Sequence, residues 1–219
     1  MPAYVIAGAS RGLGLEFVHQ LIAQGHTVIA LARNPYAATG LTAIDNKNLH
    51  VIKADITDSV TLKAAAEETA KITGGSIDVL INNGAFWERR HMFHNILEYE
   101  DEASLLSDFN ANWHTNVIGP ILTTNAFLPL LRAGRTKKIL TLSTGIADPE
   151  LVRASGYAGQ CAYSVSKCAL EMVNLKFSLA LKDEGFTCLA ISPGVVNTSD
   201  APRTPAQPPL QCGTLTHNA

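Results

Sequence analysis

Short apolar runs alternate with longer amphipathic stretches along most of the chain. The apolar runs are nearly continuous in Val, Ile, Leu and Ala, which is typical of strands that are covered on both faces of a sheet. Alternation of such strands with helical stretches predicts right-handed βαβ crossovers. We therefore expect an α/β fold with a doubly wound parallel sheet between two helical layers, and we find no internal repeat.

The pattern places six strands and four helices. The expected strands are Tyr4–Ala9, Thr27–Ala32, Leu49–Ala54, Ile77–Asn82, Lys138–Ser143 and Thr187–Ser192. The expected helices are Gly14–Gln24, Ser59–Thr73, Glu102–Arg132 and Tyr163–Glu184. Residues 1–198 thus form one domain, whereas residues 199–219 hold four prolines and few large apolar groups, which predicts an irregular tail.

Composition narrows the class of protein. The 219 residues are 47% hydrophobic and 16% charged, which excludes a disordered solvating chain. The net charge of −2 provides no basic surface, so we expect neither nucleic acid nor membrane as a partner. Met1-Pro2-Ala3 leads directly into an apolar segment, and the four cysteines show no paired or CxxC spacing. We expect a soluble, reduced, cytoplasmic protein without a signal peptide.

The first strand is followed by a glycine-rich turn, Gly8-Ala9-Ser10-Arg11-Gly12-Leu13-Gly14, and then by a helix. Glycine allows the backbone to turn sharply and to approach a pyrophosphate, while a helix N-terminus supplies free N–H groups and a positive dipole. A glycine trio alone can serve a purely steric turn. Its place between strand one and helix one of a doubly wound sheet predicts a nucleotide site.

A second motif is Tyr163-Ser164-Val165-Ser166-Lys167, which places a phenol and an ammonium at i and i+4 on one helix face. A nearby positive charge stabilises a phenolate, so this pair suits acid–base chemistry. By chance, the same spacing also occurs as an exposed lysine beside a half-buried tyrosine. Its place after strand five, behind the glycine turn, favours catalysis.

Together the two motifs resemble the short-chain dehydrogenase/reductase family, whose fingerprint is T-G-x-x-x-G-x-G, with Ala7 here in place of Thr. The resemblance covers residues 3–198 and implies a Rossmann fold. It also implies a catalytic set and a nicotinamide nucleotide site. The implied catalytic residues are Asn116, Ser143, Thr144, Tyr163 and Lys167. The implied cofactor contacts are Gly8, Ser10, Arg11, Gly12, Leu13, Gly14, Arg33, Asp55, Ile56, Asn83, Gly84, Tyr163, Lys167, Pro193, Gly194, Val196 and Thr198.

Charge at the end of the second strand bears on the choice of cofactor. An NAD site usually places an acid there, but this strand ends in Ala32-Arg33-Asn34. Arg11 and Arg33 together could clamp a 2′-phosphate, because guanidinium groups match phosphate geometry. We therefore expect NADPH/NADP+ rather than NADH, the alternative being that both are solvated surface arginines. The resemblance assigns Asp55 to the adenine amino group; otherwise it is a turn or cap acid.

The resemblance implies an oxidoreductase that transfers a hydride from NADPH to a ketone or aldehyde carbonyl, and the reverse oxidation of an alcohol stays open. Ser143 or Thr144 would polarise the oxygen, and Tyr163 would supply the proton. Lys167 would lower the pKa of Tyr163 and connect through water to Asn116. We lean to Thr144 over Ser143; for Asn116 the alternative is a helix-interior side chain satisfied by backbone. No metal is expected, because His91 and His94 lack a third ligand.

Three features depart from the family pattern. Asn82-Asn83-Gly84-Ala85 stands where the family has N-N-A-G, and an extended loop separates Thr144 from Tyr163. Residues 86–99 mix aromatic, basic and acidic side chains, which suits either a substrate pocket or a surface loop. Within the family, residues 115–131 are similar to sniffer-like carbonyl reductases and fungal polyketide ketoreductases.

The third departure lies after Thr198, where the family's substrate-covering segment and seventh strand are not recognisable in the proline-rich tail. We expect the strand Thr187–Ser192 to form a sheet edge. The tail is either irregular or a remodelled substitute for that segment. The alternative function is a catalytically weak NADP-binding protein that acts through a partner. The resemblance further implies a homodimer or homotetramer and a small-molecule carbonyl or alcohol as substrate.

Overall fold

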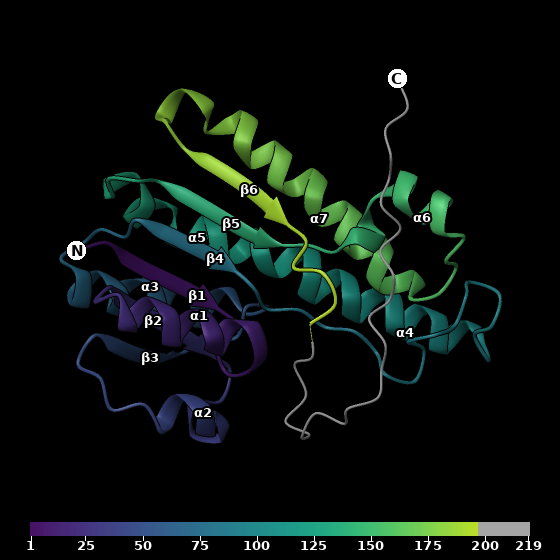
Figure 1. Ribbon diagram of the computed structural model, residues 1–219, viewed down its shortest axis with the longest axis horizontal. Coiled ribbons are helices and arrows are strands. Elements are labelled where there is room, and N and C mark those ends of the chain that lie inside the picture. Colours follow the sequence, from purple (N-terminus) through teal and green to yellow (C-terminus); the bar gives the residue numbers. More distant parts are fainter. Residues whose placement is uncertain (197–219) are drawn as a thin grey trace.

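The centre of the molecule is a parallel sheet, seen in Figure 1, a computed structural model that describes residues 1–196. Within these residues the sheet has six strands in the order β3-β2-β1-β4-β5-β6, all parallel to their neighbours. The strands are β1 (Ala3–Ala7), β2 (Thr27–Ala32), β3 (Leu49–Lys53), β4 (Val79–Asn82), β5 (Lys138–Leu142) and β6 (Thr187–Ile191). This order is that of a Rossmann fold, and the predicted fold class is confirmed.

Helices connect the strands. They are α1 (Gly12–Ala23), α2 (Thr39–Thr42), α3 (Ser59–Thr73), α4 (Glu102–Trp113), α5 (Gly119–Ala133), α6 (Pro149–Ser155) and α7 (Cys161–Ala180), with the short 3₁₀ turns η1 (Pro35–Ala37), η3 (Gly145–Ala147) and η4 (Lys182–Glu184). The expectation of a helix reaching Glu184 was wrong, because α7 ends at Ala180 and a 3₁₀ turn follows.

The expected single helix over Glu102–Arg132 is interrupted. A π turn, η2 (His114–Ile118), joins α4 to α5, and the Gly119 N–H donates to the His114 carbonyl five residues earlier. One extra residue in the turn widens the helix without breaking it, so α4, η2 and α5 remain one helical path. Asn116 lies at the centre of this turn.

Two apolar clusters hold the helical layers on the sheet. On one face, side chains such as Val5, Leu80 and Ile139 pack against α3, α5 and the end of α7, where Phe127 and Leu131 are fully buried. On the other face, alternate residues of the same strands pack against α1 and α2. Because adjacent strand residues point to opposite faces, both clusters require the continuous apolar runs found in the sequence.

The strand β6 forms the sheet edge, as expected, and pairs with β5 among the described residues. Figure 1 shows α7 alongside it. Leu189 and Ile191 on β6 are 52% and 42% exposed, so this strand is covered less than the central ones. The expected tail, residues 199–219, lies outside the described residues. None of the helices in the described part of the chain has the length and apolar character that a bilayer span requires.

The strand order reverses between β1 and β4. In doubly wound sheets, ligands bind in the crevice beyond the carboxyl ends of the strands at this switch point. The glycine turn follows β1, the Asn83-Gly84 turn follows β4, and Thr144 lies beyond the end of β5. The fold therefore brings the separate predicted site segments to one edge of the sheet.

Candidate active site

The turn after β1 is built from backbone that only glycine adopts easily. Gly8 and Gly12 have φ of 83° and 57°, in the left-handed region. A Cβ on Gly8 would lie 2.5 Å from the Gly84 Cα, and the Asn83 amide donates to the Gly8 carbonyl at 2.7 Å. The Asn83 and Gly84 N–H groups also donate to the Ala7 carbonyl. The turns after β1 and β4 are thus locked together, so these glycines serve packing as well as cofactor approach.

The start of α1 differs from those of α3, α4 and α6, and it shares its lack of a capping side chain with α2, α5 and α7. Asp58, Asp101 and Asp148 cap α3, α4 and α6 with side-chain hydrogen bonds. At α1 the cap position is held by Arg11, whose side chain makes no capping bond, and the first turn has no acidic residue. An uncapped, acid-free helix start keeps its N–H groups and its positive dipole available to an anion. The backbone of Ser10, Arg11, Gly12 and Leu13 therefore suits a pyrophosphate.

The residues expected at the adenosine end lie beyond β2 and β3. Arg11 and Arg33 are both exposed, and neither forms an ion pair within residues 1–196. Asp55 accepts from the N–H and hydroxyl of Thr57 at 2.9 and 2.7 Å, through its Oδ1. Burial alone would raise the pKa of Asp55, but these bonds and the charge of Arg33 hold it below the usual range. Asp55 is thus a charged turn residue, and none of the described hydrogen bonds uses its Oδ2.

The remaining cofactor segments frame the crevice. Ile56 lies between two glycines, since a Cβ on Gly84 would meet its Cδ1 at 2.9 Å and one on Gly119 would meet it at 3.2 Å. Beyond β6, Gly194 has φ of 74°, and Pro193 and Val196 are exposed. Thr198, expected to contact the nicotinamide, lies outside the described residues.

The predicted catalytic pair, Tyr163 and Lys167, is on α7. Lys167 is only 2% exposed, and its Nζ donates to the Leu142 carbonyl at 2.7 Å. The same Nζ lies 5.7 Å from the centroid of the Tyr163 ring. The lysine is therefore buried between the end of β5 and the tyrosine, which excludes the alternative of an exposed lysine beside a half-buried tyrosine.

Burial shifts the pKa of both groups. It lowers the pKa of Lys167 from 10.5 to about 8 and raises the pKa of Tyr163, because in each case the charged form loses water. The expected lowering of the Tyr163 pKa by Lys167 is not found, since desolvation dominates at the phenol. At neutral pH Lys167 therefore remains mainly protonated, and Tyr163 is a neutral phenol that can donate a proton.

The two hydroxyls at the end of β5 differ in their partners. Ser143 is buried and donates to Glu171 Oε1 on α7 at 2.5 Å. Thr144 is half-buried, and among the described hydrogen bonds none uses its hydroxyl. Since Ser143 is already engaged, the geometry favours Thr144 as the hydroxyl that can face a substrate.

Asn116 is fully buried in the π turn, and its side chain is occupied. Its Oδ1 accepts from the Phe86 N–H at 2.7 Å, and its Nδ2 faces the Phe86 carbonyl, Asn112 Oδ1 and Ser166 Oγ at 2.8 to 3.0 Å. The side chain thus ties the loop after β4 to α4 and α7. A contact with a relay water would have to come from the main chain of the π turn, a type of turn frequent at functional sites.

Sequence reasoning missed three polar residues of this region, namely Asp108, Asn112 and Glu171. Asp108 and Asn112 precede Asn116 at intervals of four, and Glu171 follows Lys167 by four. Residues four apart share a helix face, so each helix presents a row of polar groups. This spacing was the available signal. The sequence-based prediction also lacked α6, although Asp148-Pro149 and Gly156 are typical start and stop residues of a helix.

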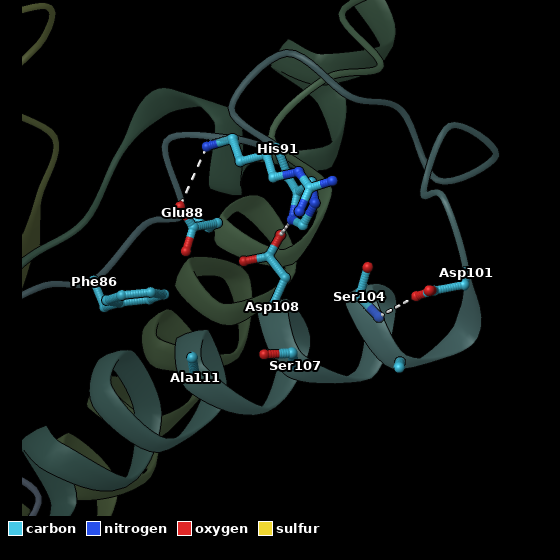
Figure 2. Close-up of a pocket in the computed structure, with 10 residues that line it drawn as sticks. Phe86, Glu88, His91, Asp101, Ser104, Ser107, Asp108 and Ala111 are labelled. Atoms are coloured by element: carbon cyan, nitrogen blue, oxygen red, sulfur yellow. Dashed lines mark hydrogen bonds and ion pairs between the residues drawn. The ribbon is translucent and has the colours of Figure 1, made fainter.

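A cavity of about 360 Å³ lies between the loop after β4 and α4 (Figure 2). Asp108 extends from α4 towards the His91 ring, while Phe86 and Glu88 come from the loop. A smaller recess shares Glu88, His91 and Asp108 with this cavity. It is lined further by Trp87, Met92, Asn112, Gln160 and Tyr163. Residues 86–99 therefore contribute to a pocket that borders the tyrosine.

Sequence comparison places this arrangement in a family. A profile described as short chain dehydrogenase matches residues 3–208. A relative from Aspergillus aculeatus, the short-chain dehydrogenase/reductase AacuF, is 40% identical over 203 residues, which is 91% of this chain and 76% of that protein. The uncharacterized oxidoreductase C663.06c of Schizosaccharomyces pombe is 38% identical, over 90% of this chain and 75% of that protein.

Solved structures agree. The NADPH-bound carbonyl reductase from chicken fatty liver superposes with a TM-score of 0.76 at 28% identity, over 90% of this chain and 80% of that one. The carbonyl reductase Sniffer of Caenorhabditis elegans, described as putative in its structure report, shares the fold with a TM-score of 0.75 at 24% identity, over 88% and 85%. By its sequence, its strand order and the residues at its switch point, the chain belongs to the short-chain dehydrogenase family of oxidoreductases.

Proposed function

We propose that this protein reduces a ketone or aldehyde carbonyl with NADPH, in the cytoplasm, through Tyr163 as proton donor. The observation that carries the proposal is the buried Lys167 ammonium, fixed by the Leu142 carbonyl and placed beside the Tyr163 ring. A buried lysine is costly to keep unless its charge is used, and such groups cluster at functional sites. The same chemistry in reverse would oxidise an alcohol.

The side chains divide the work. Tyr163 holds the proton that the carbonyl oxygen needs, and burial keeps the phenol protonated. Thr144 can donate a second hydrogen bond to that oxygen, because Ser143 is engaged by Glu171. Lys167 places a positive charge near the phenolate that forms when the proton leaves. Asn116 keeps α4, α7 and the Phe86 segment in register.

The residues of the crevice fit a nicotinamide dinucleotide. The uncapped start of α1 suits the pyrophosphate, and Asp55 keeps one carboxylate oxygen available towards an adenine amino group. Arg11 and Arg33, both exposed beside this site, favour a 2′-phosphate and therefore NADPH over NADH. NADPH would supply the hydride. Among the solved relatives, the chicken carbonyl reductase is described as NADPH-bound.

The substrate would enter through the recess beside Tyr163. Trp87 and Met92 give this recess apolar and polarisable walls, and Gln160 adds an amide. The adjoining cavity of about 360 Å³ is lined by the Arg90 guanidinium, the His91 ring and the carboxylates of Glu88 and Asp108. A carbonyl compound with an apolar body and a polar end fits these walls.

Turnover tests the proposal. The purified chain is mixed with NADPH and a panel of ketones and aldehydes, and loss of NADPH absorbance is followed. Tyr163→Phe is expected to lower kcat/KM by about 10²- to 10⁴-fold, the usual contribution of a general acid. Tyr4→Phe is the matched control, because it removes a phenol hydroxyl from β1 at the opposite end of the sheet.

Two results would overturn the proposal. One is NADPH binding with no turnover of any carbonyl or alcohol, which would favour a cofactor-binding protein that acts through a partner. The other is turnover that Tyr163→Phe leaves unchanged, because the proton would then come from elsewhere. Equal losses in Tyr163→Phe and Tyr4→Phe would also contradict a specific role for Tyr163.

We further propose that the protein assembles as a homodimer or homotetramer through α4 and α7. Both helices carry large exposed apolar side chains, namely Leu106 and Trp113 on α4 and Val165, Met172, Leu175 and Leu179 on α7. Exposed apolar groups gathered on neighbouring helices are typical of an interface between subunits. Size-exclusion chromatography with light scattering is expected to show two or four copies, and a monomer at micromolar concentration would contradict it.

A further inference from the structure

A line of buried side chains connects the loop before α4 to the catalytic helix. The Tyr99 hydroxyl donates to Asp108 Oδ2 at 2.8 Å, and Asn112 Nδ2 donates to Asp108 Oδ1 at 2.7 Å. Asn116 Nδ2 then donates to Asn112 Oδ1 and to Ser166 Oγ, each at 3.0 Å. These bonds form one continuous chain, which we call the α4 polar chain.

The α4 polar chain ends at the catalytic tyrosine. Ser166 Oγ donates to the Tyr163 carbonyl at 2.7 Å, and Ser166 immediately precedes Lys167. Asp108, Asn112 and Ser166 are 6%, 1% and 1% exposed. Buried polar groups are costly unless they are bonded, so the chain holds these side chains in one arrangement.

The Asp108 carboxylate and the main chain favour one direction for the bonds of this chain. An ionised aspartate only accepts hydrogen bonds, so Asn112 must present its NH₂ to Asp108. The Asn112 oxygen therefore points to Asn116, which must present its own NH₂ in return. That choice leaves the Asn116 oxygen facing the Phe86 N–H. The main chain favours the same two orientations, because the Phe86 carbonyl also accepts from Asn116 Nδ2 and the Asp108 carbonyl also accepts from Asn112 Nδ2.

We propose that Asp108 and Asn112 are positioning residues for catalysis. They orient the amide of Asn116 and, through Ser166, hold Tyr163 and Lys167 in place relative to the loop after β4. Figure 2 shows the outer end of the chain, where Asp108 Oδ2 lies 3.5 Å from His91 Nδ1 at the cavity wall. The effect on kcat rests on the proposed reductase function, whereas the effect on local structure does not.

Exchanging the two side chains tests the direction of the bonds. Asn112→Asp places two carboxylates in contact, and it is expected to lower kcat at least about tenfold, since a hydrogen bond to a buried charge is lost. Asp108→Asn still offers an oxygen to Asn112 and is expected to lower kcat less than Asn112→Asp does. In the double variant D108N/N112D the amide donates to the new carboxylate, which again accepts from Asn116. That variant is expected to recover kcat to within about threefold of wild type.

Three further measurements separate positioning from general damage. The Kd for NADPH is expected to change less than about threefold in all variants, because the chain does not touch the cofactor turn. Hydrogen–deuterium exchange of peptides covering residues 114–118 and 161–170 is expected to rise in Asn112→Asp and to return in the double variant. Asn110→Asp, the same change at an exposed position of α4, is the control and is expected to behave as wild type.

Several outcomes would overturn the proposal. One is an Asn112→Asp variant whose kcat and hydrogen exchange equal those of wild type. Another is a double variant whose kcat is no higher than that of Asn112→Asp. Loss of NADPH affinity in parallel with kcat would indicate general damage instead. If Asn112→Asp does not fold, recovery of folding and kcat by the double variant supports the chain, and its failure contradicts it. If the wild-type protein shows no turnover, the proposed reductase function is contradicted. The exchange measurement would still test whether the α4 polar chain orders the helices.

Discussion

The proposed cofactor turn, residues 8–14, and the proposed catalytic corner around Tyr163 and Lys167 occupy the same edge of the sheet, but they are built differently. The turn after β1 is shaped by backbone: two left-handed glycines, an uncapped helix and carbonyls that contact β4. The corner at α7 is shaped by side chains that bond across three helical segments and the end of β5. A backbone site depends on a few glycines, whereas a side-chain site depends on every partner along the network.

This difference affects tolerance to substitution. In the turn, any Cβ at Gly8 meets main-chain atoms that cannot move without shifting the sheet. In the corner, loss of one hydroxyl or amide leaves the backbone in place and changes orientation instead. We therefore expect changes in the turn to act on folding and cofactor binding, and changes in the corner to act on kcat.

The largest effect is expected from Gly8→Ala. An alanine at position 8 would have to adopt a φ of 83°, and its Cβ would lie 2.5 Å from the Gly84 Cα. Together these two effects are expected to lower the free energy of unfolding by about 3 kcal/mol. Gly84→Ala approaches the same contact from the other side but meets mainly the Cδ1 of Ile56, a flexible side-chain end. It is expected to cost less than about 1 kcal/mol. Urea unfolding of both variants measures the difference, and equal losses would contradict a backbone origin.

The next effect separates the two hydroxyls of β5. Thr144→Val removes a hydroxyl but keeps the branched shape, and it is expected to lower kcat about 100-fold, as loss of one oxyanion donor does. Thr144→Ser is expected to retain activity. Ser143→Ala removes the bond to Glu171 and is expected to lower kcat by less than about threefold. The reverse ranking in steady-state kinetics would assign the catalytic hydroxyl to Ser143.

The same contrast explains which features could be predicted from the sequence. The strands and the glycine turn follow from local signals: continuous apolar runs and the spacing of Gly8, Gly12 and Gly14. Tyr163 and Lys167 were identified because their spacing on one helix is itself local. The burial of Lys167 could not be predicted in this way, since it depends on a contact with the Leu142 carbonyl of a distant strand.

The network around Asn116 shows where local signals end. The Asn116 side chain bonds to Phe86 and Ser166, which are 30 and 50 residues away along the chain. Asn116 lies in a π turn, which adds one residue to a helix that otherwise continues. The amino-acid composition of this segment therefore does not reveal the turn. Ser143 and Thr144 could not be distinguished either, since the distinction depends on Glu171 across the α7 contact.

A smaller effect is expected in the pH dependence of stability. The pKa of Lys167 falls from 10.5 in the unfolded chain to about 8 in the folded protein, so the folded state binds fewer protons between these values. The contribution of Lys167 to stability therefore rises with pH, by about 2 kcal/mol between about pH 7.5 and 10. Cys161, Cys188 and the buried tyrosines contribute with the opposite sign, because burial raises their pKa values, so the contribution of Lys167 is read as the difference between wild type and Lys167→Met. Lys167→Met is expected to abolish this rise, while Lys176→Met, at an exposed position of α7, keeps it. An identical slope in wild type and Lys167→Met would contradict the burial of a titrating lysine.

The smallest effect is expected in cofactor affinity, at the arginine side chains beside the cofactor turn. Arg33→Ala is expected to raise the Kd for NADPH about tenfold, the value of one charge-assisted bond, and to leave the Kd for NADH unchanged. Arg11→Ala is expected to have the same effect on the two Kd values. Arg135 precedes β5 at the opposite end of the sheet, and Arg135→Ala is expected to leave both Kd values unchanged. Isothermal titration with both nucleotides measures this. Equal affinities for NADPH and NADH in wild type would mean that Arg11 and Arg33 are surface arginines, and that the backbone alone binds the dinucleotide.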